Sequence, residues 1–64
     1  MKIHLPDGTA RTFEGGVARV SDLLLSIRVN PVGVIVSRNG RVVPEDTILG
    51  QDDEIRIIQV SHGG

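Results

Sequence analysis

Residues 53–64 read DEIRIIQVSHGG and give the clearest structural signal in the chain. Successive side chains of a β-strand point to opposite faces of a sheet. In this stretch Ile55 and Ile57 share one face, whereas Ile58 and Val60 share the other. Both faces carry bulky aliphatic residues, so we expect this stretch to be the last strand of a sheet. A helix should cover the face that carries Ile55 and Ile57, and the other face should lie open.

One short amphipathic segment provides that helix. Ser21 is a suitable N-cap, because its hydroxyl can accept a hydrogen bond from an unpaired amide of the first turn. Pro31 disfavours helical angles at the residue before it, so we expect the helix to end near Val29 after about two turns. Leu25 lies outside the apolar face of this helix. The residues expected to face the sheet are Val20, Leu23, Leu24 and Ile27.

The remaining strands surround this helix in sequence. Alternating or apolar patterns predict strands at residues 1–5, 9–14, 34–37 and 41–43, and Asn39-Gly40 is a strong signal for a two-residue hairpin turn. The acidic residues 52–54 are interpreted as a solvated loop. Strands on both sides of a single short helix predict an α+β fold of two layers.

The bulk composition limits the functions that the chain can perform. With 64 residues there is room for one domain, which we assign to residues 1–60, followed by a flexible tail, 61–64. The chain has no cysteine, a net charge of −1 and scattered basic residues. It therefore offers no zinc–thiolate site, no nucleic-acid surface and no membrane span, and no acid–base pair or nucleophile stands out. We expect a cytoplasmic protein that is not itself an enzyme and acts through a partner.

The tail Ser61-His62-Gly63-Gly64 is the main candidate for chemistry. Glycine lacks a Cβ, so a diglycine terminus can pass through a narrow channel of another protein. Its carboxylate is a poor acyl donor, and ATP can activate it as an acyl-adenylate. The alternative is an ordinary terminus without a role, and spacing alone does not separate the two.

The open face of the last strand is the second candidate. Ile58, Val60 and Ile35 would form an apolar patch next to the tail, with Arg56 on the same face, and such patches often mark partner surfaces. Ordinary surface aliphatic residues are the alternative. His4 and His62 are interpreted as surface histidines, and we expect no metal site.

Several segments together resemble prokaryotic ubiquitin-like sulfur carriers. The segments are Asn30-Pro31, Val34-Ile35-Val36, Asn39-Gly40, Val42-Val43-Pro44-Glu45-Asp46 and the whole ending from Asp53 to Gly64. The relatives are the thiamine-pathway sulfur carrier, the small archaeal modifiers, the ubiquitin-related modifier of tRNA thiolation and the small subunit of molybdopterin synthase. This resemblance implies a β-grasp fold, with a mixed sheet of four to five strands on one helix.

The resemblance also implies a mechanism. An activating enzyme that uses ATP and magnesium adenylates the Gly64 carboxylate, while Ser61, His62 and Gly63 thread through its channel. A sulfur donor then converts the terminus to a thiocarboxylate, and an acceptor enzyme passes the sulfur to a thiazole precursor, a tRNA base or a pterin. No cofactor is bound stably. Two alternatives stay open: a modifier that forms isopeptide bonds with lysines of target proteins, and a non-conjugated interaction module. Ser61 and His62 depart from the small or apolar residues of many relatives.

Overall fold

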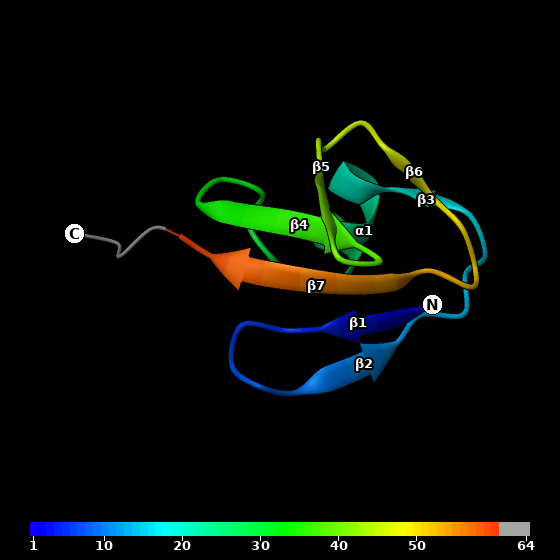
Figure 1. Ribbon diagram of the computed structural model, residues 1–64, viewed down its shortest axis with the longest axis horizontal. Coiled ribbons are helices and arrows are strands. Elements are labelled where there is room, and N and C mark those ends of the chain that lie inside the picture. The colour runs from blue at the N-terminus through cyan, green and yellow to red at the C-terminus, as the bar shows by residue number, and fades with distance from the viewer. Residues whose placement is uncertain (61–64) are drawn as a thin grey trace.

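A mixed sheet of five strands forms the frame of the molecule. The computed structural model describes residues 1–60. Its sheet has the order β2-β1-β7-β4-β5, in which β1 and β7 run parallel and the other neighbours run antiparallel (Figure 1). The elements are β1 (Lys2–His4), β2 (Ala10–Thr12), β3 (Ala18–Arg19), α1 (Val20–Ser26), β4 (Val34–Arg38), β5 (Arg41–Val43), β6 (Ile48–Leu49) and β7 (Glu54–Gln59). The predicted mixed sheet is therefore confirmed.

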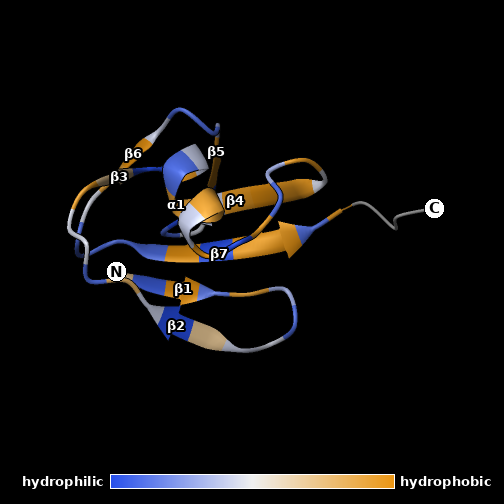
Figure 2. Cartoon of the chain, turned by 180° about the vertical axis from the view of Figure 1, so that it is seen from behind, coloured by the Kyte–Doolittle hydropathy of each residue, from blue (hydrophilic) through white to orange (hydrophobic). Residues whose placement is uncertain are grey.

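Helix α1 covers one face of this sheet and leaves the other open, as the views from the two sides show (Figures 1 and 2). Ile55 and Ile57 of β7 are buried under the helix, whereas Ile58 is exposed, as the alternation in the sequence predicts. The buried core consists of Met1, Ile3, Val20, Leu23, Leu24, Val36, Leu49, Ile55 and Ile57. The chain thus forms the predicted two-layer α+β structure.

The hairpin between β4 and β5 forms where the sequence predicts it. Asn39 and Gly40 both have positive φ, of 52° and 86°, as a type I′ turn requires. The Asn39 side chain also reaches the turn before β7: its Nδ2 donates to Asp53 Oδ1 at 3.0 Å, and its Oδ1 accepts from the Glu54 amide at 2.9 Å. The prediction of a purely solvated acidic loop is therefore wrong in part. Asp53 is hydrogen-bonded and Glu54 begins a strand.

The prediction that Ser21 caps the helix is also wrong. Helix α1 begins at Val20, and its N-cap is Arg19, two residues before the predicted cap. The Arg19 side chain makes no capping bond. The loop between β5 and β6 supplies the caps instead. The Val20 amide donates to the Thr47 carbonyl and the Ser21 amide to the Glu45 carbonyl, both at 2.9 Å. Backbone carbonyls from a distant loop thus do what a side-chain cap would otherwise do.

The helix ends in a Schellman motif without glycine. The Val29 amide donates to the Leu24 carbonyl at 2.8 Å and the Arg28 amide to the Leu25 carbonyl at 3.1 Å. Arg28 takes the left-handed position with φ of 61°. Regular helix stops at Ser26, close to the predicted end, and the motif turns Val29 back toward the sheet layer.

The short strands β3 and β6 form a separate two-stranded ladder that the sequence analysis did not predict. Ala18 pairs with Leu49 and Arg19 with Ile48. Leu49 is fully buried and Ile48 is half exposed, so the ladder closes one end of the core. Strand β7 finishes at the opposite end of the molecule (Figure 1).

Candidate functional site: the end of β7 and the open sheet face

The root of the tail is fixed by one backbone hydrogen bond. The Val60 amide donates to the Gly33 carbonyl at 2.9 Å, so the chain stays beside the loop before β4 after β7 has ended. The predicted tail residues Ser61, His62, Gly63 and Gly64 lie outside the described residues.

The apolar residues predicted on the open face lie together next to this root. Ile58 is directly opposite Ile35 in the register of β7 and β4. Ile58, Ile35 and Val60 are 42%, 36% and 51% exposed, and we call these three residues the open-face patch. Val42, which the sequence pattern did not assign to the patch, continues it. Val42 pairs with Ser37, on the same face as Ile35, and is 69% exposed.

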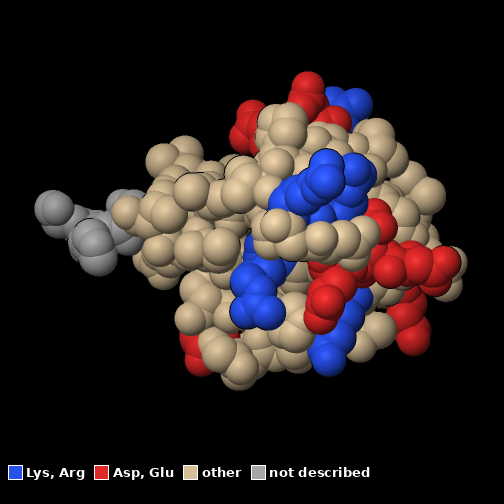
Figure 3. All heavy atoms as spheres, in the orientation of Figure 1, with Lys and Arg blue, Asp and Glu red and all other residues tan. Residues whose placement is uncertain are grey.

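Charged side chains lie farther from the tail on the same face. Figure 3, in the orientation of Figure 1, shows uncharged surface around the end that leads to the C-terminus, and Lys, Arg, Asp and Glu over the rest of the molecule. Arg56 follows Glu54 and precedes Ile58 on the open side of β7, as predicted. The patch is thus an apolar surface bordered by charge.

His4 makes a side-chain contact with Glu54, beyond its interpretation as an ordinary surface histidine. Its Nε2 lies 2.7 Å from Glu54 Oε2, across the parallel pair of β1 and β7. The hydrogen bond from His4 lowers the pKa of Glu54, and nearby positive charge, including Lys2 and Arg56, lowers it further. This contact depends on residues 50 positions apart, and periodicity gives no sign of it.

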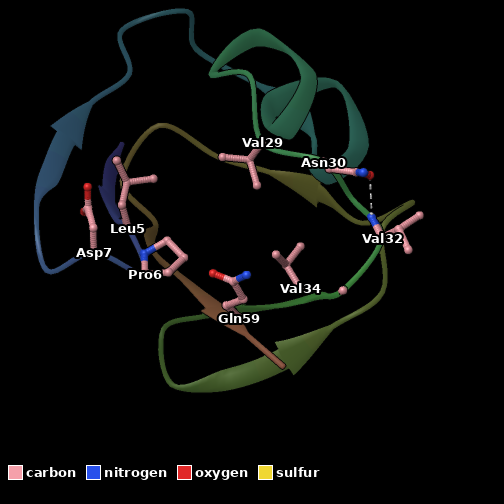
Figure 4. A pocket seen from close by; sticks show the side chains of 9 residues that line it. Leu5, Pro6, Asp7, Val29, Asn30, Val32, Val34 and Gln59 are labelled. Carbon is pink, nitrogen blue, oxygen red and sulfur yellow. Dashed lines mark hydrogen bonds between the residues drawn. The ribbon is translucent and has the colours of Figure 1, made fainter. Parts of the chain in front are cut away.

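A pocket of about 550 Å³ lies beside the tail root on the other side of the β7 end. Figure 4 shows its lining side chains, which come from the β1–β2 turn, the α1–β4 connection and the ends of β4 and β7. The lining residues are Leu5, Pro6, Asp7, Val29, Asn30, Val32, Gly33, Val34 and Gln59. Sequence analysis did not predict this pocket, because it joins two loops that are distant in sequence.

The match to a family model decides the family of the chain. The model of the ThiS family matches residues 6–64, which include the open-face patch and the terminal glycines. The chain belongs to the ThiS family. This is a family of ubiquitin-like β-grasp sulfur carriers of thiamine biosynthesis, so the expected fold and family resemblance are confirmed.

A solved ThiS structure has the same fold. The thiamine biosynthesis protein (ThiS) from Geobacter metallireducens superposes with a TM-score of 0.68 at 24% sequence identity, over the full length of both chains. At this identity the likeness establishes the shared β-grasp architecture. No curated protein matches the chain significantly.

Two further properties of the ThiS domain concern metals and membranes. Among residues 1–60, no group of three or more histidine and carboxylate side chains is placed to hold a metal ion. No helix in the described part of the chain is long and apolar enough to span a bilayer.

Proposed function

We propose that the chain carries sulfur on its own C-terminus: a partner enzyme adenylates the Gly64 carboxylate, and the terminus then becomes a thiocarboxylate. Membership of the ThiS family is the observation that carries this proposal, because the matched region runs through Gly63 and Gly64. The family points to the thiazole precursor of thiamine as the sulfur acceptor.

The chemistry divides naturally between the chain and its partner. A carboxylate oxygen attacks the α-phosphorus of ATP and displaces pyrophosphate. A persulfide sulfur then attacks the acyl carbon and displaces AMP, and a thiol cleaves the resulting S–S bond to leave the thiocarboxylate. The chain contains one lysine, Lys2, and no glycine-rich phosphate-binding motif around it. The partner therefore supplies the magnesium and the cationic groups that stabilise the phosphate charge.

The geometry of the tail root supports a mechanism in which the chain supplies the carboxylate and the partner supplies the catalytic groups. An extended tail from Ser61 to Gly64 spans at most about 13 Å, so an enzyme that holds the Gly64 carboxylate must also contact the body of the domain near Val60. The open-face patch lies there. Apolar contact at this patch would position the tail, with Arg56 bordering the contact.

Adenylation can be measured separately from sulfur transfer. The activating enzyme is incubated with ATP, magnesium, labelled pyrophosphate and the chain, and exchange of label into ATP is followed. We expect exchange with the full chain and none with a variant that lacks Gly63 and Gly64. Equal exchange with both forms would contradict the proposal. Diglycine remnants on lysines of other proteins would instead favour the modifier alternative.

A further inference from the structure

The pocket beside the tail root has two walls, with the ends of β4 and β7 between them. Leu5, Pro6 and Asp7 of the β1–β2 turn form one wall, and the α1–β4 connection, including Val32, forms the other (Figure 4). Val34 and the amide of Gln59 lie between them. The pocket is on the helix side of the sheet and is therefore distinct from the open-face patch.

Both walls are held in shape by local hydrogen bonds. In the β1–β2 turn, Asp7 Oδ1 accepts from the Thr9 amide at 2.9 Å and from Thr9 Oγ1 at 2.6 Å, and the Leu5 amide donates to the Thr9 carbonyl at 2.8 Å. In the opposite wall, the Val32 amide donates to Asn30 Oδ1 at 3.0 Å. The pocket is therefore preformed, which lowers the entropic cost of filling it.

Asp7 gives this apolar pocket a charged rim. It is the one ionisable residue in the described lining. The hydrogen bonds from Thr9, then the bond from the backbone of Asp7 itself and the positive charge of Arg11, lower the pKa of Asp7, so its carboxylate is ionised at neutral pH. Both of the bonds from Thr9 end on Oδ1.

An arginine side chain matches this combination of surfaces. It packs its methylene stem on apolar residues and keeps its charged end at a polar rim, and its planar guanidinium pairs well with a carboxylate. The chain's own terminal carboxylate is a poor occupant, because Asp7 would repel it. The occupant must therefore come from another molecule.

The position of the pocket indicates which molecule. Gly33 lines the pocket and its carbonyl accepts a hydrogen bond from the Val60 amide, so Val60, the last described residue, lies at the pocket wall. Whatever encloses Gly64 approaches within about 13 Å of that point. We propose that the pocket receives an arginine side chain of the activating enzyme, with the stem against Leu5 and Val29 and the guanidinium on Asp7. This inference depends on the proposed function for the identity of the partner.

The first test is the variant Asp7→Asn. The amide oxygen of asparagine can still accept the bonds from Thr9, so the turn is retained while the charge is lost. In pyrophosphate exchange we expect KM for the chain to rise about tenfold, with kcat unchanged and a weaker dependence of KM on salt. The matched control Asp46→Asn removes an exposed carboxylate in the β5–β6 loop and should behave as wild type. Equal KM values for the two variants would overturn the proposal.

The second test finds the partner residue. Arginines around the channel of the activating enzyme are changed singly to glutamine and combined with Asp7→Asn in double-mutant cycles. One arginine should lose its effect when Asp7 is already neutral. Additive effects for every arginine would contradict the proposal.

Methyl NMR separates this proposal from the proposed function. Adding the enzyme should shift the methyl signals of Val29 and Val34, whether or not exchange takes place. Exchange without these shifts overturns the pocket proposal alone. Shifts without exchange support the pocket and overturn the proposed function, and the absence of both overturns both.

Discussion

Ile35 and Ile58 lie opposite each other across β4 and β7, on the face of the sheet that no helix covers. Cross-strand aliphatic pairs of this kind stabilise a sheet. Here the pair remains about 40% exposed and lies next to Val60, where the tail begins. A partially exposed pair at that position is available for contact with a partner.

Replacing Ile58 by threonine tests this contact. Threonine is also β-branched and suits a strand, but it loses apolar surface at the patch. We expect KM for the activating enzyme to rise about tenfold. Ile48→Thr is the matched control, since Ile48 is 51% exposed but lies in β6, away from the tail. Similar KM values for the two variants would argue against docking at the patch.

Adjacent leucines of α1 test the two-layer packing. Leu24 is 2% exposed and belongs to the core, whereas Leu25 is 64% exposed. Leu24→Ala should lower the free energy of unfolding by about 2–5 kcal/mol, and Leu25→Ala should change it by about 0.5 kcal/mol or less. Urea unfolding followed by circular dichroism measures both. Equal losses in the free energy of unfolding would mean that Leu24 does not face the sheet.

The helix end predicts a stabilising substitution. Arg28 has φ of 61°, a conformation that glycine adopts without steric cost. Arg28→Gly should therefore raise the free energy of unfolding by up to about 1 kcal/mol. Arg11→Gly, in strand β2, should lower the free energy of unfolding, because Arg11 does not have a positive φ that glycine would adopt at lower cost. A loss of stability in Arg28→Gly would contradict the Schellman geometry.

Acid should destabilise the domain through the turn before β7. The Gly50 amide bond and then the Asn39 side-chain bond lower the pKa of Asp53 from its ordinary value of 3.8. A carboxyl group whose pKa is lower in the folded state stabilises the fold above its unfolded pKa. That contribution is lost as the pH falls through the folded pKa. The pKa shifts of Asp7 and Glu54 have the same sign.

Asp53→Asn tests this assignment. We expect the urea midpoint of this variant to fall less than that of wild type as the pH is lowered from about 5. Asp52→Asn removes a neighbouring charge and none of these bonds, so it should keep the wild-type acid dependence. If both variants lose stability with acid as wild type does, Asp53 is not responsible.

The features that the sequence predicted correctly depend on local patterns. Alternation placed Ile55 and Ile57 under the helix and Ile58 on the open face, and Asn39-Gly40 specified a turn that needs positive φ. The same alternation placed the residues of the open-face patch together. Val42 could have been added from its position in the 41–43 strand.

The features that the sequence did not predict depend on contacts between distant segments. Carbonyls of Glu45 and Thr47 replace a side-chain cap at the start of α1, so the hydroxyl of Ser21 is not needed there. Arg28 occupies the left-handed position after the helix, where glycine is the usual residue. The His4–Glu54 pair needs the parallel alignment of β1 with β7. The pocket likewise exists only once the β1–β2 turn and the α1–β4 connection have been brought together.

The central claim is that the Gly64 carboxylate itself carries the sulfur. The most direct measurement is the intact mass of the chain after incubation with its activating enzyme, ATP, magnesium and a sulfur donor, with fragmentation to locate any change. We predict that one oxygen is exchanged for sulfur at Gly64, only when ATP is present. A chain that keeps an unmodified terminus while the enzyme consumes ATP and the donor, or that gains sulfur elsewhere, would contradict the claim.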